Sequence, residues 1–263
     1  MIFASDLDRT LIYSKSSAED HLNDSTLVEY YDKKSNSYMK NSVIKDLMDF
    51  SEKNLFIPVT TRTMEQYERI SFFQEKLKPR FAIVANGAVL LVDGKRSQEW
   101  DEIILAEHHN YKEKKKELIQ FILFNIEKKC IIKLKEAEEY FLYLILNIEH
   151  IDDKKITKVS KWAESQEWIV SQQGRKIYFI PRYINKRAPL QYLREKQNIV
   201  GEIFASGDSI LDYPLVKYAD FSMVPLHGEI ICYDSTLNKT SERGIKSSLE
   251  IMKKVNEYSK KLN

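Results

Sequence analysis

Two aspartates near the N-terminus, Asp6 and Asp8, come at the end of an apolar run over residues 2–7 that is typical of a short buried strand. Acidic side chains two positions apart at a strand end can face one site and offer oxygen ligands to a cation. In parallel α/β proteins, ligands bind beyond the carboxyl ends of the strands. Taken alone, the pair is equally compatible with two acids that face water.

A second polar group, Thr60-Thr61-Arg62, follows an apolar run at residues 55–59. A hydroxyl at this place can donate to a phosphate oxygen, and an arginine can bind an anion with two parallel hydrogen bonds. The alternative is a threonine that caps the helix expected from Met64. For this motif alone, the capping interpretation is favoured.

A third group follows the apolar run at residues 202–206 and reads Gly207-Asp208-Ser209-Ile210-Leu211-Asp212. Carboxylates from different strand ends suit Mg²⁺, which needs only one or two protein carboxylates and keeps several waters. The alternative is a helix start with an acidic first turn. Lys186 comes just before the helical pattern at residues 188–195. Taken alone, it is interpreted as a solvated charge.

The elements that must position these groups alternate between strand and helix. The pattern predicts a parallel sheet covered by helices on both faces, an α/β fold of the Rossmann-like kind. The expected strands lie at residues 2–7, 55–59, 81–85, 202–206 and 220–224, and the expected helices at 42–53, 64–77, 188–195, 213–217 and 241–262. A hairpin is expected within residues 27–39. Pro58 counts against a central strand at 55–59 unless it lies near the strand end.

The middle of the chain follows a different pattern. Helical periodicity at residues 110–129 and 153–165 is followed each time by two strand-like runs, at 131–134 and 140–148, then at 168–171 and 176–180. Helix, strand, strand, repeated, predicts an antiparallel sheet with helices on one face. We therefore expect a core of residues 1–94 and 181–263, interrupted by a smaller α+β domain at 95–180.

Jointly, these motifs resemble the haloacid dehalogenase-like superfamily of phosphatases, over nearly the whole chain. The first motif of that family, D-x-D-x-T, matches Asp6, Asp8 and Thr10. The second matches Thr60, with Thr61 in place of the usual glycine and Arg62 retained; the third matches Lys186, and the fourth, G-D-x-x-x-D, matches Asp208 and Asp212. Asn86-Gly87 resembles the branch with a large α/β cap, which includes sucrose-phosphate, mannosylphosphoglycerate and Cof-type sugar phosphatases.

The resemblance implies a role for each matched residue. Asp6 would attack phosphorus, Asp8 would act as acid and base, and Thr60 and Lys186 would hold the phosphoryl oxygens. Mg²⁺ would be bound by Asp6, the backbone carbonyl of Asp8, and Asp208, with Asp212 orienting its water or Lys186. The implied substrate-binding residues are Thr10, Thr61, Arg62, Asn86 and Gly87.

The implied activity is Mg²⁺-dependent hydrolysis of a small phosphomonoester, with sugar phosphates as the expected class. Two alternatives stay open: phosphotransfer to another acceptor, as in a mutase, and ligand binding without turnover. Arg9 stands where relatives often carry glycine or asparagine, and could reach solvent or a second anion of the substrate. Substrate choice is expected to depend on residues 130–180 and 13–41, but the sequence of these segments does not identify the substrate.

The overall composition excludes some partners. Lys plus Arg is 41 and Asp plus Glu is 39, a net charge of +2, which gives no case for a nucleic-acid surface. The longest apolar run, at residues 140–146, is too short to cross a bilayer. Two cysteines and an acidic N-terminus without a signal-peptide pattern predict a cytoplasmic protein that contacts neither membrane nor nucleic acid. The sequence holds no signal for an oligomeric state.

Overall fold

A computed structural model describes residues 1–18 and 21–262; residues 19, 20 and 263 lie outside it, including that part of the loop expected at 13–41. The chain divides into two compact units. The first joins two segments, Met1–Ser97 and Asn185–Asn263, and the second is Gln98–Ile184. The division falls a few residues after each boundary expected from the sequence.

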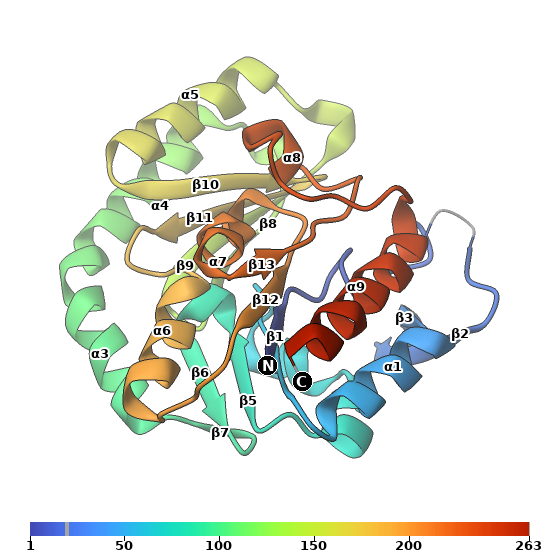
Figure 1. The fold of residues 1–263 in the computed structure, drawn as a ribbon. Coiled ribbons are helices and arrows are strands. Elements are labelled where there is room, and N and C mark those ends of the chain that lie inside the picture. The colour runs from blue at the N-terminus through green and yellow to red at the C-terminus, as the bar shows by residue number, and fades with distance from the viewer. Residues whose placement is uncertain (19–20, 263) are drawn as a thin grey trace. The chain divides into compact units, whose positions relative to one another are not determined.

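The centre of the first unit is a parallel sheet with the strand order β13-β12-β1-β4 (Figure 1). Its strands are β1 (Ile2–Ser5), β4 (Leu55–Pro58), β12 (Ile203–Ser206) and β13 (Phe221–Ser222). The predicted α/β fold class is confirmed. Pro58 is the last residue of β4, and β4 ends this sheet's strand order, so the proline does not interrupt the ladder.

The strands of this sheet are continuous apolar runs because both faces are covered. All four residues of β1 are buried, and the ring of Phe3 packs against Phe50, Phe56 and Phe204. Two helices pack together on one side, α1 (Asn41–Ser51) and α9 (Ser247–Leu262), and two on the other, α6 (Arg187–Lys196) and α7 (Tyr213–Tyr218) (Figure 1).

A smaller antiparallel sheet consists of β5 (Phe81–Val84), β6 (Val89–Val92) and β7 (Lys95–Arg96). A single parallel bridge, Val59 to Ile83, joins β5 to the chain that leaves β4. The strand expected at 81–85 is therefore beside β4, as a parallel sheet requires, but it pairs mainly with the hairpin that follows it.

A second hairpin, β2 (Ser25–Tyr31) and β3 (Lys34–Lys40), lies between β1 and α1 along the chain. It coincides with the hairpin expected within 27–39. Its ladder is irregular on both sides of Glu29, whose backbone also bridges Ile70.

Two predicted helices differ from the observed ones. The helix expected at 64–77 is two pieces, α2 (Met64–Glu68) and the π-helix η1 (Phe72–Leu77), because Ile70 pairs with Glu29 between them. The closing helix expected from residue 241 begins at Ser247, after the 3₁₀ turn η7 (Gly244–Lys246).

The second unit is a four-stranded antiparallel sheet with helices packed on it, as predicted. Its elements are α3 (Gln98–His108), α4 (Lys112–Asn125), β8 (Ile131–Ala137), β9 (Phe141–Leu146), α5 (Asp153–Ser165), β10 (Trp168–Gln173) and β11 (Lys176–Pro181). The strand order is β10-β11-β9-β8. α4 and α5 share one apolar core with alternate residues of β9, so both cover the same sheet face. α3 is not among the helices expected from the sequence.

The remaining elements are short. They are the 3₁₀ turns η2 (Ala85–Gly87), η3 (His109–Tyr111), η4 (Lys128–Cys130), η5 (Ile148–His150) and η6 (Ile210–Asp212), and the helix α8 (Ile230–Tyr233). Within residues 1–18 and 21–262, each helix is too short or too polar to traverse a lipid bilayer.

Gly87 is required by both conformation and space. Its φ is +100°, and a Cβ there would lie 2.2 Å from the carbonyl oxygen of Asn185. Gly94 also has a positive φ, +75°, but a Cβ there would meet nothing within 4 Å. Alanine substitutions at the two glycines therefore distinguish the cost of backbone strain from the cost of steric overlap.

We predict that Gly87→Ala lowers the free energy of unfolding by about 3 kcal/mol or more, since a clash adds to left-handed strain. Gly94→Ala, with the strain alone, should cost about 1–2 kcal/mol. Urea denaturation of both variants measures the difference. If both variants lost the same free energy of unfolding, the carbonyl of Asn185 would have moved away from the new Cβ at no energetic cost.

Candidate active site

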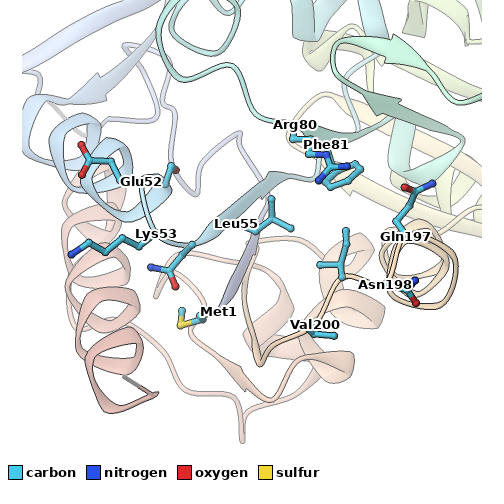
Figure 2. Close-up of a pocket in the computed structure, with 12 residues that line it drawn as sticks. Met1, Glu52, Lys53, Leu55, Arg80, Phe81, Gln197, Asn198 and Val200 are labelled. Carbon is cyan, nitrogen blue, oxygen red and sulfur yellow. The ribbon is translucent and has the colours of Figure 1, made fainter.

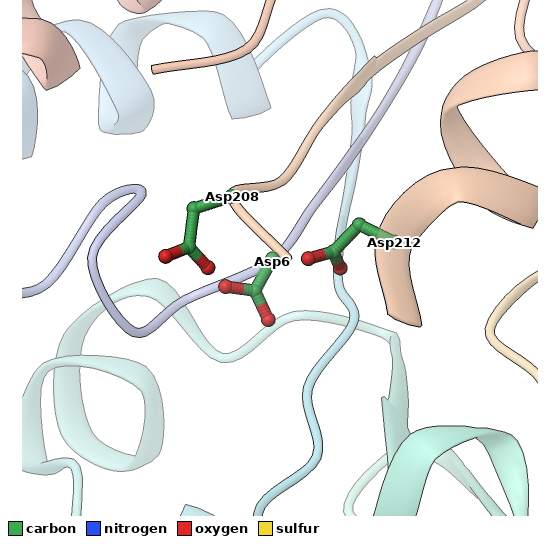
Figure 3. Close-up of side chains that lie close together, drawn as sticks. All are labelled: Asp6, Asp208 and Asp212. Carbon is green, nitrogen blue, oxygen red and sulfur yellow. The ribbon is translucent and has the colours of Figure 1, made fainter. Parts of the chain in front are cut away.

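Three buried aspartates meet at the carboxyl ends of β1 and β12. Asp6 directly follows β1, Asp208 follows β12, and Asp212 ends η6. One carboxylate oxygen from each lies within 4.8 Å of the others, and Figure 3 shows the three groups turned toward one another. The cause is the strand register: Ser5 is level with Ser206, and the Asp6 amide donates to the Ser206 carbonyl over 2.9 Å.

Gly207 makes room for the third of these carboxylates. A Cβ at Gly207 would lie 2.3 Å from Cγ of Asp212, so the aspartate packs directly on bare backbone. The amide and hydroxyl of Ser209 donate to Asp212 Oδ2 over 2.9 and 2.8 Å. These bonds fix Asp212, which is fully buried.

Lys186 supplies the positive charge of the cluster. Its Nζ donates to Asp6 Oδ1 over 2.6 Å and to Asp212 Oδ1 over 2.5 Å, and the residue is 1% exposed. Burial opposes its charge, but the carboxylates of Asp212 and Asp6 raise its pKa above the ordinary value. The lysine therefore stays protonated although it is enclosed.

One lysine does not neutralise three acids. Burial raises the pKa of Asp6 to about 7; Lys186 opposes this shift, and the charges of Asp212 and Asp8 add to it. The pKa of Asp208 is also raised, by burial and then by Asp6 and Asp212. A buried set of carboxylate oxygens with excess negative charge fits a hard divalent cation such as Mg²⁺.

Of the hydroxyl and amide residues expected at the site, Thr10 contacts an acid of the cluster, and Thr60 contacts Arg62 and Asn86. Thr10, fully buried, donates to Asp6 Oδ2 over 3.3 Å. Thr60, also fully buried, accepts the amide of Arg62 on its hydroxyl, and its carbonyl accepts the amide of Asn86. Thr61 is partly exposed.

Asn86 has an unusual environment among the described residues. Its backbone is left-handed, with φ +57°, and its side chain is 1% exposed. Its Oδ1 is buried without a hydrogen-bond partner. A buried acceptor of this kind is costly unless a donor completes it, which is consistent with the expectation that Asn86 binds substrate.

Asp8 and Arg62 form a two-bond ion pair. Nε and Nη2 of Arg62 donate to Asp8 Oδ2 and Oδ1 over 2.7 and 2.8 Å. The third nitrogen, Nη1, lies 2.9 Å from Glu29 Oε2. The guanidinium that the sequence analysis assigned to a substrate anion is bound here to two protein carboxylates, so that assignment stays a prediction.

The Asp8 carboxylate is bound to Arg62 and is not one of the three acids whose oxygens lie within 4.8 Å of one another. This carboxylate is 48% exposed, whereas Asp6, Asp208 and Asp212 are buried. Asp8 is expected to bind the metal through its backbone carbonyl. The position of its side chain does not test this role, which stays a prediction.

Arg9 is held in a left-handed conformation, φ +60°, beside the cluster. Its carbonyl accepts the Tyr13 hydroxyl over 2.8 Å and His227 Nε2 over 2.9 Å. The amide of Gly244 donates to His227 Nδ1, so the neutral ring carries its proton on Nε2. The Arg9 guanidinium, 45% exposed, reaches Asp208 over 3.4 Å.

Tyr13, Glu29 and His227 also contact the site, and none of them was predicted individually from the sequence. They belong to no motif. Tyr13 reaches Thr10 three residues away, whereas Glu29 and His227 contact Arg62 and Arg9 only through tertiary structure. A tyrosine and a histidine at those positions carry no local signal.

A pocket of about 410 Å³ lies elsewhere on the first unit (Figure 2). It is lined at the opposite ends of the strands, by Met1 before β1 and Leu55 at the start of β4, and by Arg80 and Val200. None of the residues expected at the site lines it, so it is separate from the acid cluster.

No protein-family model and no curated protein matches the chain. Solved structures are similar over nearly its full length. A sucrose-phosphatase from Synechocystis sp. PCC6803, solved with sucrose and phosphate, shares 16% identity, with a TM-score of 0.67, over 97% of this chain and 98% of that one. A haloacid dehalogenase-like hydrolase protein from Bacillus subtilis shares 17% identity, with a TM-score of 0.56, over 97% and 91%. The chain has the haloacid dehalogenase-like fold.

The same fold is found in the C-terminal domain of trehalose-6-phosphate phosphatase from C. albicans. That domain shares 11% identity, with a TM-score of 0.65, over 95% of this chain and 90% of its own. Coverage of this kind includes both compact units. The predicted resemblance to proteins of the haloacid dehalogenase-like fold is confirmed at the level of the fold.

We predict that Mg²⁺ raises the melting temperature of this protein, and raises it more at pH 8 than at pH 6. The folded metal-free protein holds the Asp6 proton more tightly than the unfolded chain does, with a pKa of about 7 against 3.8. Its stability therefore falls as pH rises between these values, and Mg²⁺ must displace the proton below pH 7. At 100 times its Kd the ion adds about 2.7 kcal/mol.

Differential scanning fluorimetry with and without Mg²⁺ measures this shift. Asp208→Asn should reduce it, whereas Asp8→Asn should keep it, because the Asp8 side chain lies outside the cluster. An equal Mg²⁺ shift in wild type and Asp208→Asn would contradict the assigned ligands.

Proposed function

We propose that this protein is a Mg²⁺-dependent phosphatase that hydrolyses a small phosphomonoester through an aspartyl-phosphate on Asp6. The observation that carries the proposal is the buried cluster of Asp6, Asp208 and Asp212 with Lys186 at the carboxyl ends of a parallel sheet. Phosphoryl transfer depends on positioning and on positive charge around the phosphoryl group. The cluster offers both a nucleophile and places for that charge.

In the proposed site, Mg²⁺ is held by the carboxylates of Asp6 and Asp208 and by the backbone carbonyl of Asp8, with Asp212 fixing its surroundings. The ion supplies charge that offsets the repulsion between an anionic nucleophile and an anionic substrate. Lys186 and Thr10 hold the two oxygens of Asp6, over 2.6 and 3.3 Å, and so orient the nucleophile.

The proposed reaction has two steps. Asp6 attacks phosphorus, the bond from phosphorus to the leaving oxygen breaks, and Asp8, which would carry a proton while the substrate is bound, gives it to that oxygen. Asp8 then takes a proton from water, which attacks phosphorus and breaks the bond to Asp6, releasing inorganic phosphate. Lys186 and Thr60 would stabilise the charge spread over the phosphoryl oxygens in both steps.

Sugar phosphates are the substrate class we propose. The similar structures include a sucrose-phosphatase and a trehalose-6-phosphate phosphatase. We propose that the unit Gln98–Ile184 is a cap that contributes to substrate choice, together with Thr61, Asn86 and Gly87 of the first unit.

We predict Mg²⁺-dependent release of inorganic phosphate in a screen of phosphomonoesters, measured by a colorimetric phosphate assay. Asp6→Asn should lower kcat at least ~10³-fold, because no other group can form the covalent intermediate. Circular dichroism of the variant provides the control for folding.

Turnover by folded Asp6→Asn would reject the assignment of the nucleophile. Isomerisation of a sugar phosphate without net phosphate release would indicate a mutase. Binding of substrates without turnover by the wild type would indicate a ligand-binding protein.

A further inference from the structure

Glu29 is a fully buried carboxylate outside every motif of the proposed reaction. Its side chain is 0% exposed, and each group that contacts it can donate a hydrogen bond. Ser37 Oγ and Asn36 Nδ2 donate to Oε2 over 2.6 and 2.7 Å, Arg62 Nη1 lies 2.9 Å from the same oxygen, and Arg69 Nε lies 3.4 Å from Oε1. Burial disfavours its charge, but Arg62 and these bonds lower its pKa below the ordinary value.

The hairpin is deformed where it presents this residue. The β2–β3 register shifts on both sides of Glu29, and two successive residues, Val28 and Glu29, are both buried. In a regular strand neighbouring side chains point to opposite faces, and a bulge re-aims one of them. The backbone of Glu29 pairs with Ile70, which holds the re-aimed side chain beside α2.

The guanidinium of Arg62 joins Glu29 to Asp8. Two of its nitrogens bind the two oxygens of Asp8 over 2.7 and 2.8 Å, and the third faces Glu29. The group is planar and rigid, so fixing one edge fixes the direction of the other. Asp8, at 48% exposure, is anchored through an arginine whose own side chain is 10% exposed.

We propose that Glu29 is a positioning residue, which holds Arg62 so that Arg62 orients the Asp8 carboxyl for proton transfer to the leaving group. The inference rests on the proposed phosphatase function and extends the active site to the β2–β3 hairpin. A purely structural Glu29 would instead only neutralise Arg62 and Arg69 and fasten the hairpin to α2.

The two roles differ in their dependence on the leaving group. An alkyl phosphate expels a strongly basic oxygen and needs the proton from Asp8, whereas 4-nitrophenyl phosphate expels a stable phenolate and does not. Misorienting Asp8 should therefore slow the phosphorylation of Asp6 far more for the first substrate than for the second, whereas the later attack of water, which also uses Asp8, is common to both. Loss of hairpin docking alone should slow both alike.

The test is Glu29→Met, which keeps the size of the side chain and removes its acceptors. We expect kcat/KM, which reports the steps up to departure of the leaving group, to fall by about 10- to 100-fold for the alkyl phosphate that wild type hydrolyses fastest, a partial loss of the ~10²–10⁴-fold contribution of a general acid. The kcat/KM for 4-nitrophenyl phosphate should change by less than about 3-fold, since its leaving group requires no acid. Glu29→Gln, which retains an oxygen acceptor for Arg62, should restore most of the loss.

Arg69→Met is the matched control. It removes the other arginine on Glu29, which does not contact Asp8 in the structure, so it should change both substrates by the same factor. If Glu29→Met does not fold, Glu29→Asp is the substitute, because it shortens the side chain by one methylene and moves the carboxylate away from Arg62. It should also slow the alkyl phosphate more than 4-nitrophenyl phosphate, with a smaller difference between the two.

Equal losses for both substrates in the Glu29 variants, or no loss, would overturn the positioning role. A crystal structure of Glu29→Met separates this result from failure of the proposed function. Arg62 still bound to both oxygens of Asp8 would refute the positioning role even if wild type showed no phosphatase activity. A displaced Arg62 with an inactive wild type would reject only the phosphatase.

Discussion

Repulsion among three enclosed carboxylates is the constraint on which this structure depends. Asp6, Asp208 and Asp212 bring oxygens within 4.8 Å of one another where water cannot screen them. Lys186 and Arg9 compensate part of the charge, and burial, with the neighbouring charges of Asp212 and Asp8, raises the pKa of Asp6 to about 7 although Lys186 opposes the shift. Folding tolerates such a cluster because the parallel sheet, the bare backbone of Gly207 and the Ser209 bonds hold each group in place.

Much of the fold could be predicted because its signals are local. Short apolar runs alternate with amphipathic segments in the first unit, and helix, strand, strand repeats in the second. The meeting of Asp6 with Asp208 could be anticipated as well, since neighbouring parallel strands end at one edge of a sheet. α3 was missed because its buried residues are a single line four apart, Trp100, Ile104 and His108, whereas the apolar Ile103 and Leu105 beside Ile104 are exposed, so the helical pattern is weak.

What could not be predicted depends on contacts between distant segments. The break between α2 and η1 follows from the pairing of Ile70 with Glu29, which no helical periodicity reveals. The partners of Arg62 have the same origin: an arginine after a strand resembles an anion ligand, and only the re-aimed Glu29 and the exposed Asp8 determine what it binds. A bulge adds a residue without leaving a periodic trace in the sequence.

The ion pair between Lys186 and Asp6 spans 180 positions, with one contiguous unit between them. During synthesis, Asp6 therefore leaves the ribosome long before Lys186, and Asp208 leaves it after Lys186. Because domains generally fold as units during synthesis, and long-range pairings close slowly, the nascent first segment must wait with an unfinished sheet while Gln98–Ile184 emerges. The edge of β1 that pairs with β12 is unpaired during that interval, so we expect translation speed and access to chaperones to affect the yield of folded protein.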